Sequence, residues 1–184
     1  MAATDMLPAT APRGAATPLL EVREVSRYFG GVHALERVSM GVRAGTVHGL
    51  IGPNGAGKTT LINLLTGFYR PTSGQILLDG KRLDGLRPHQ IARLGVARTF
   101  QNIRLFGNLP ALDNVLVGRR RGGVRRSLGR VVFLSATARQ DRAEYLVALD
   151  LLGRSGIDGH DRRPAGTLSY GDQRRVELAR ALAT

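Results

Sequence analysis

The sequence predicts an α/β fold, and three observations support this prediction. A β-branched, largely apolar run, "TVHGLI" (Thr46 to Ile51), leads into a glycine-rich turn, and "TTLINLLTG", which has helical spacing, follows at once. Two further apolar runs and a hairpin-like segment indicate antiparallel strands on either side of this unit. From Pro110 to Gly153 the apolar residues are spaced as in helices.

The composition is that of a globular domain. The chain has 184 residues, of which 42% are hydrophobic and 22% charged, enough to bury a core. It contains no cysteine, which excludes disulfides and thiolate metal sites and favours a reducing compartment. No apolar run approaches the roughly 18 residues of a membrane span. Residues 1–18 are rich in Ala, Thr and Pro, and we expect a flexible arm rather than a signal peptide there.

The formal net charge of +13 raises the question of a nucleic-acid partner. The basic residues are 25 arginines and two lysines, and the densest cluster runs from Arg119 to Arg130. That cluster has no aromatic residue on which a base could stack. We favour a solvated loop, with an anionic lipid headgroup or acidic partner next and nucleic acid least favoured.

The strands are expected at about Leu20 to Val25 and Val38 to Val42, with a hairpin at Ser73 to Leu83. Within the hairpin, "QILLDG" ends in Asp79-Gly80, a turn dipeptide. These segments predict an antiparallel β-subdomain beside the strand at Thr46 to Ile51.

Two helical features follow later in the chain. Leu146, Leu149 and Leu152 form a rough apolar stripe, which we interpret as core packing. Ser169, three positions before Asp172, matches a capping box and is the expected N-cap of the last helix.

The motif with the clearest chemistry is "GPNGAGKTT", from Gly52 to Thr60, which satisfies G-x-x-x-x-G-K-[ST] between an expected strand and a helix that stops at Gly67. Such a P-loop turns backbone N–H groups toward phosphates at a helix N-terminus. Lys58 should reach the β- and γ-phosphates, and the Thr59 hydroxyl should ligate Mg²⁺. The alternative is a glycine-rich turn with a chance lysine. The expected phosphate-site residues are Gly52, Asn54, Gly55, Ala56, Gly57, Lys58, Thr59 and Thr60.

Three motifs together resemble the nucleotide-binding domain of ABC transporters. The P-loop, Gln101 in "VARTFQNIRLF", and "LSYGDQRR" from Leu168 occur in that family's order and approximate spacing, from about Leu19 to Thr184. The segment from Gly95 to Gly118, with "SYGDQ", resembles the ATP-binding subunits of branched-chain amino acid importers. The resemblance implies a P-loop NTPase of ABC type, with an antiparallel β-subdomain and a helical signature subdomain at about residues 110–170.

The resemblance also implies roles for two residues outside the P-loop. Phe29 aligns with the aromatic that stacks on adenine, with Tyr28 as a fallback; the alternative is a core residue at a strand end. Gln101 aligns with a glutamine that contacts Mg²⁺ or its water near the membrane subunits; the alternative is an ordinary polar residue at a strand end.

The segment "LSYGDQRR", which aligns with the signature motif of the family, can also be interpreted physically. A capped helix presents free N–H groups and a positive dipole end at its start, and Gly171 would admit a phosphate closely. In the family this end contacts ATP held by the opposing subunit, which implies a dimer; the alternative is an ordinary capped helix. Tyr170 stands where the commonest family form has glycine, and Asp172 where glutamine is usual. The signature residues are Ser169, Tyr170, Gly171, Asp172 and Gln173.

Hydrolysis in the family requires a further strand, with an aspartate for Mg²⁺ and a neighbouring glutamate for the attacking water, and later a histidine. All would fall after Thr184, so we expect a C-terminally truncated domain that lacks the Walker B strand and is inactive alone. Asp79 in "QILLDG" imitates such a strand, but no glutamate follows it and we interpret it as a hairpin turn. None of the four histidines is a supported catalytic candidate.

The expected function is that of an ATP-binding subunit of an ABC importer for branched-chain amino acids, with ATP and Mg²⁺ as cofactors. The expected partners are a second ATP-binding subunit, membrane permease subunits and, indirectly, a substrate-binding protein, at the cytoplasmic face of the membrane. The alternatives are a soluble ABC-type ATPase acting on nucleic acid and a non-catalytic ATP-binding fragment.

Overall fold

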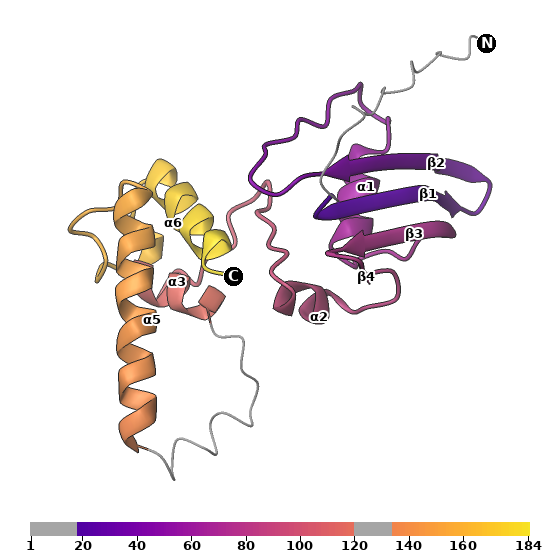
Figure 1. Ribbon diagram of the computed structural model, residues 1–184. Helices are drawn as coiled ribbons and strands as arrows, with labels where there is room; N and C mark the ends of the chain where they lie inside the picture. Colours follow the sequence, from indigo (N-terminus) through magenta and orange to yellow (C-terminus); the bar gives the residue numbers. More distant parts are fainter. Residues whose placement is uncertain (1–17, 120–133) are drawn as a thin grey trace. The chain divides into compact units, whose positions relative to one another are not determined.

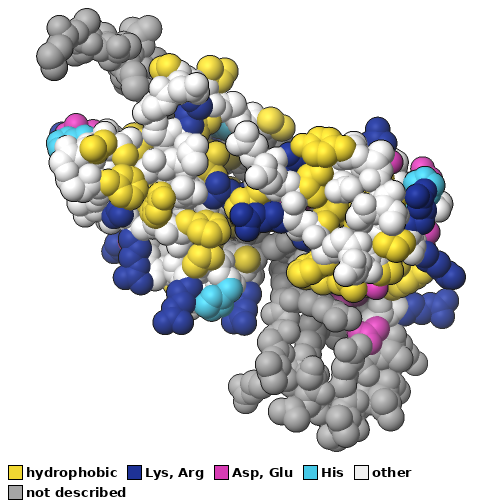
Figure 2. Space-filling model, turned by 180° about the vertical axis from the view of Figure 1, so that it is seen from behind, with side chains coloured by type: hydrophobic (Ala, Val, Ile, Leu, Met, Phe, Trp, Pro, Cys, Tyr) yellow, Lys and Arg dark blue, Asp and Glu magenta, His cyan; other side chains and the backbone are white. Residues whose placement is uncertain are grey.

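The structure is a computed structural model that describes residues 18–119 and 134–184. The chain divides into two compact units, Met1–Arg87 and Pro88–Thr184, which are considered separately. The expected arm lies outside the described residues except for Pro18, and so do residues 120–130 of the basic cluster. The expected helical subdomain at about residues 110–170 stays a prediction. On the face shown in Figure 2, lysine and arginine side chains are spread over both units.

The first unit is built on a four-stranded antiparallel sheet in the order β2-β1-β3-β4 (Figure 1). Strands β1 and β2 are longer than the sequence predicts, because the pairing continues to the Phe29–Val32 pair on either side of a two-glycine turn. The strands are β1 Leu20–Phe29, β2 Val32–Val42, β3 Ser73–Leu78 and β4 Lys81–Arg82.

One face of this sheet is covered by α1, Lys58–Leu65, which crosses the strands in Figure 1. The strands contribute the buried side chains of Val22, Val25 and Ile76, and the helix contributes those of Leu61 and Leu64. Val22 and Val25 are three positions apart, and the shift in pairing register between them lets both side chains be buried. Leu61 and Leu64 have the spacing of one helix face.

Helix α1 ends as the sequence predicts. Gly67 has a φ of 75°, and its N–H donates to the Leu64 carbonyl at 3.1 Å while the Phe68 N–H donates to the Asn63 carbonyl at 2.9 Å. These two bonds form a Schellman motif, which needs a left-handed residue such as glycine after the helix.

The hairpin interpretation of Asp79 is confirmed. Asp79 and Gly80 have φ angles of 48° and 73° and connect β3 to β4. Two consecutive positive φ angles are typical of a type I′ turn. Asp79 is therefore a turn residue and not the end of a buried strand.

The predicted strand from Thr46 to Ile51 is wrong for this structure. Residues 46–51 have no strand assignment, and Val47 and Ile51 are 100% and 94% exposed. A β-branched run becomes a strand only where a neighbour accepts its hydrogen bonds and covers its side chains. None of the described strands pairs with this segment.

The second unit is helical. It contains α2 Pro88–Arg93, α3 Ala111–Arg119, α5 Leu134–Arg154, the short 3-10 helix Ala165–Thr167 and α6 Tyr170–Leu182 (Figure 1). Helices α3, α5 and α6 pack on one another. The buried apolar residues of this core, from the helices and the segments next to them, include Ala111, Leu112, Val115, Ala148, Leu152, Ile157, Leu168, Val176, Ala179 and Ala183.

The apolar stripe of α5 is only partly core. Leu152 is buried and Leu149 packs against the core, but Leu146 is 56% exposed, so the core interpretation is wrong for Leu146.

Helices α3 and α6 approach closely at Gly118, where a Cβ would lie 2.3 Å from the Arg180 carbonyl oxygen. No helix in the described ranges combines the length and the apolarity that a membrane crossing requires.

Candidate functional site

The glycine-rich turn before α1 has a defined backbone shape. Gly55 and Gly57 have φ angles of 87° and 80°, left-handed conformations that glycine adopts readily. The Ala56 N–H donates to the Pro53 carbonyl at 3.3 Å. A Cβ on Gly57 would lie 2.5 Å from the carbonyl oxygen of Ala34 on β2. Glycine therefore lets this turn pack directly against the sheet.

Helix α1 presents hydrogen-bond donors at its start. Gly57 is the N-cap, no side chain caps the helix, and the first turn contains no acidic residue. The first N–H groups of a helix, here those of Lys58, Thr59 and Thr60, have no partner within the helix, and the helix dipole adds partial positive charge. A glycine-rich turn followed by such a helix start suits a phosphate group.

Lys58 adds a full positive charge to the same place. Its Nζ donates to the carbonyls of Gly52 and Pro53 at 2.6 Å each, so the ammonium group lies over the turn. Thr59 is exposed in the first turn of α1, and its hydroxyl is a hard oxygen ligand of the kind that Mg²⁺ takes beside phosphate oxygens. Amide donors, an ammonium group and a hydroxyl together fit a magnesium-bound polyphosphate.

Phe29 lies at the end of β1 and is 38% exposed. The Tyr69 ring meets it edge-on at 5.1 Å between centroids, and the Arg27 guanidinium lies 4.4 Å from the Phe29 ring centroid. The fallback residue, Tyr28, packs instead on the His33 ring at 4.2 Å. Phe29 is thus part of an exposed aromatic group in the same unit as the P-loop, and not a buried core residue.

The signature turn has the expected cap. Ser169 is the N-cap of α6, and its Oγ accepts from the Asp172 N–H at 3.1 Å. The same hydroxyl donates to an Asp172 carboxylate oxygen at 2.7 Å, a variation on the usual box, in which the carboxylate accepts from the N-cap amide. Gln173 Nε2 donates to the Leu168 carbonyl at 3.0 Å. A Cβ on Gly171 would have no atom closer than 3.9 Å, so the turn is open there.

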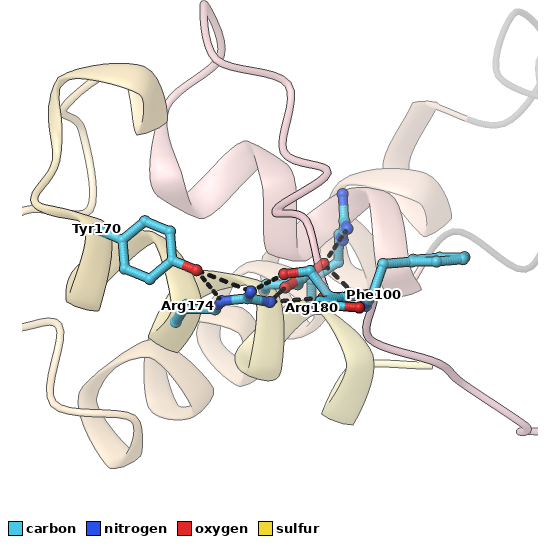
Figure 3. A network of polar contacts seen from close by, with 6 residues as sticks. Phe100, Tyr170, Arg174 and Arg180 are labelled. Atoms are coloured by element: carbon cyan, nitrogen blue, oxygen red, sulfur yellow. Dashed lines mark hydrogen bonds and ion pairs between the residues drawn. The ribbon is translucent and has the colours of Figure 1, made fainter. Parts of the chain in front are cut away.

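Gln101 is joined to the signature helix through its backbone, as Figure 3 shows for its neighbour Phe100. Arg174 on α6 donates to the Phe100 carbonyl at 2.6 Å and also to the Gln101 carbonyl. The Phe100 N–H donates to the Glu177 carboxylate at 3.5 Å. The structure therefore brings Gln101 together with the signature residues inside the second unit, while the P-loop and Phe29 belong to the first.

Arg174 and Glu177 are the residues that sequence reasoning missed. Glu177 is 1% exposed and lies beside Val176 and Ala179 on the buried side of α6. A carboxylate on the apolar side of a predicted helix was the available signal, because a buried charge requires a partner.

The arginines around Glu177 have shifted pKa values. The hydrogen bond with the Tyr170 hydroxyl raises the pKa of Arg174, with partial burial acting in the opposite direction. Burial lowers the pKa of Arg180, and the charge of Glu177 opposes that shift. An arginine loses its proton only far above neutral pH, so both side chains remain cationic at neutral pH.

This geometry matches a known family. A family model described as ABC transporter matches residues 35–184. The chain belongs to the ABC transporter family. This ABC transporter chain is 45% identical over 167 residues to the high-affinity branched-chain amino acid transport ATP-binding protein BraF of Pseudomonas aeruginosa. The aligned residues cover 91% of this chain and 66% of BraF. The chain thus spans just under two thirds of that relative's length.

Two solved structures resemble it as well. The ADP conformation of MJ1267, an ATP-binding cassette of an ABC transporter, has a TM-score of 0.74 at 31% identity, covering 91% of this chain and 65% of that one. The dimeric structure of MJ0796, a bacterial ABC transporter cassette, has a TM-score of 0.66 at 26% identity, covering 89% and 69%. The fold of this ABC transporter chain is therefore that of an ATP-binding cassette, with an antiparallel sheet and helices.

Proposed function

We propose that this chain is the ATP-binding subunit of an ABC importer for branched-chain amino acids. The observation that carries the proposal is the uncapped start of α1, where Gly57 packs against β2 and Lys58 lies over the turn. The similarity to BraF supports branched-chain amino acids as the class of transported substrate. ATP would be held by the P-loop, and its binding would drive movement of the membrane subunits.

Each site residue then has a role. The backbone amides from Asn54 to Thr60 bind the phosphates, and Lys58 balances their negative charge. Thr59 and Gln101 are the proposed contacts of Mg²⁺. Phe29 stacks on the adenine ring, which the partly exposed ring at the end of β1 suits.

The assembly is proposed to be a dimer of ATP-binding subunits. Ser169 and Gly171, at the start of α6, would meet the γ-phosphate of ATP held by the opposing subunit. The dimeric structure of MJ0796, a bacterial ABC transporter cassette, supports a dimer. The membrane permease subunits and, through them, a substrate-binding protein are the further partners, which puts the subunit at the cytoplasmic face of the membrane as a peripheral protein.

No residue of this chain is proposed as a catalytic base. The aspartate and glutamate that hydrolysis in the family requires have no counterpart in residues 1–184, and Asp79 is a turn residue. We therefore infer that residues 1–184 alone bind nucleotide without multiple turnovers.

The chain's two lysines provide a matched test of nucleotide binding. Calorimetric titration with MgATP should show binding to the unsubstituted chain, weakened about 10- to 100-fold in Lys58→Ala, since a hydrogen bond to a charged group contributes roughly 1.5–3 kcal/mol. Lys81→Ala, in the exposed strand β4, should bind as the unsubstituted chain does. Equal loss in both variants, or full binding by Lys58→Ala, would contradict the proposal.

A phosphate-release assay on the same samples tests the second inference. We expect less than one phosphate per chain. Sustained release that Lys58→Ala abolishes would show that this chain is an active ATPase.

A further inference from the structure

Arg174 lies where two motifs of the proposed function meet. Besides the Phe100 and Gln101 carbonyls, its guanidinium donates to the Tyr170 hydroxyl at 2.9 Å and the Glu177 carboxylate at 3.1 Å (Figure 3). A guanidinium carries five donors in a rigid plane. One side chain therefore binds the loop that carries Gln101 and the first turn of the signature helix at the same time.

Glu177 makes this connection costly to break. Its side chain is 2% exposed, and its carboxylate faces Arg174, the Phe100 N–H and Arg180, whose Nη2 lies 3.9 Å away. A buried carboxylate that loses a donor keeps its desolvation cost. Moving the Phe100–Gln101 segment away from α6 would remove an N–H donor from Glu177 and two acceptors from Arg174.

Tyr170 extends the connection to the signature turn. The residue is 67% exposed, yet its hydroxyl accepts from both Nε and Nη2 of Arg174. Glycine, the residue noted above as the commonest in the family at this position, has no hydroxyl to offer. Ser169 and Gly171 flank Tyr170, so whatever fixes Tyr170 also fixes the residues proposed to meet the partner's nucleotide.

We propose that Arg174 is a positioning residue that makes the Gln101 loop and the Tyr170 turn move as one piece. The role in nucleotide binding rests on the proposed function above; the mechanical connection itself does not. In the assembled protein, a displacement of Gln101 would be transmitted directly to Ser169 and Gly171.

Hydrogen–deuterium exchange of the unliganded full chain tests the connection. Arg174→Met should raise exchange in residues 99–103 and 168–173 about tenfold, the effect of losing a charged hydrogen bond of about 1.4 kcal/mol or more. Tyr170→Phe, which removes only the hydroxyl, should raise exchange in the same two segments by a smaller factor.

The control is Arg175→Met, at the next position of α6. Within residues 18–119 and 134–184, the Arg175 side chain pairs with Asp172 of the same helix, at 3.0 Å, and with no residue of the segment 99–103. It should leave residues 99–103 unchanged. If Arg174→Met leaves both segments unchanged, or raises exchange equally through the α3 and α5 core, the positioning role is wrong. Tyr170→Phe decides the matter should Arg174→Met fail to fold.

A second arm adds an unhydrolysable ATP analogue with Mg²⁺. The unsubstituted chain should gain protection in residues 99–103 and 168–173 together, and Arg174→Met should uncouple the two responses. A joint response that survives in Arg174→Met would overturn the proposal. Absence of any response in the unsubstituted chain would count against the proposed function, while the unliganded comparison would still decide the connection.

Discussion

The Phe29 side chain is held from two directions, by the Arg27 guanidinium at 4.4 Å and the Tyr69 edge at 5.1 Å. A cation beside an aromatic ring is attracted to its electron-rich face, and an edge-on ring is another favourable neighbour. Such contacts fix the ring's orientation before any ligand arrives. If a base stacks on the exposed part of the ring, as proposed, less orientational freedom is lost on binding.

Phe29→Ala should separate base recognition from phosphate recognition. We expect the Kd for MgATP to rise roughly 10-fold or more, since stacking of a base on an aromatic side chain contributes about 1–3 kcal/mol. The affinity for inorganic tripolyphosphate, measured by the same calorimetry, should stay the same because that ligand has no base. Should Tyr28→Ala lose ATP affinity while Phe29→Ala keeps it, Tyr28 would be the stacking residue.

The shape of the glycine-rich turn before α1 and the Ser169 cap could be predicted from the sequence, because each depends on a short contiguous pattern of glycine, a capping serine and a helix start. Arg174 and Glu177 could not. Their partners at Phe100 and Gln101 are more than 70 positions away in the sequence, and only the folded chain brings these groups together.

At the level of elements, the P-loop turn packs closely against β2 at Gly57. A Cβ at Gly57 would meet the Ala34 carbonyl oxygen at 2.5 Å and the Leu35 Cδ2 at 2.6 Å. The leucine end can move, but the carbonyl belongs to the sheet. Gly55 has a similar positive φ and no atom within 4 Å of its Cβ position.

Alanine substitutions at these two glycines should therefore differ. Both variants force alanine into a left-handed conformation, which costs about 1–2 kcal/mol. Only Gly57→Ala adds a backbone clash, so urea unfolding should give it the larger loss of free energy of unfolding, by roughly 1 kcal/mol or more. Equal losses would mean that the turn does not pack against β2 as the structure shows.

Elements fixed by local signals were predicted well, and the one that depends on a distant partner was not. The β3–β4 turn, the end of α1 at Gly67 and the cap at Ser169 follow from residues within a few positions. Residues 46–51 have the right composition for a buried strand, yet none of the described strands pairs with them. Strand propensity measures fit to a neighbouring strand, and a sequence segment alone does not contain that neighbour.

At the scale of the whole molecule, the two proposed phosphate-binding ends lie in different units. The start of α1 belongs to the first unit and the start of α6 to the second. Both present helix N-termini, so both attract anions, and neither can serve as the other's ligand. A nucleotide held between the P-loop of one subunit and the signature turn of another would satisfy both ends.

A mixing experiment tests this claim most directly. Lys58→Ala removes the ammonium group proposed to bind the phosphates. Gly171→Asp places a negative charge in the signature turn, where a Cβ fits because the nearest atom would be 3.9 Å from it. In the proposed heterodimer of these two variants, one of the two nucleotide sites is intact. The Gly171→Asp subunit supplies its P-loop and the Lys58→Ala subunit supplies its signature turn.

The measurement is the molar mass by sedimentation with an unhydrolysable ATP analogue and Mg²⁺, for each variant alone and for an equimolar mixture. We predict nucleotide-dependent dimers for the unsubstituted chain and the mixture, and monomers for either variant alone. If the unsubstituted chain forms dimers but the mixture stays monomeric, the signature turn does not serve a neighbour's nucleotide; an unsubstituted chain that stays monomeric would contradict the claim as well.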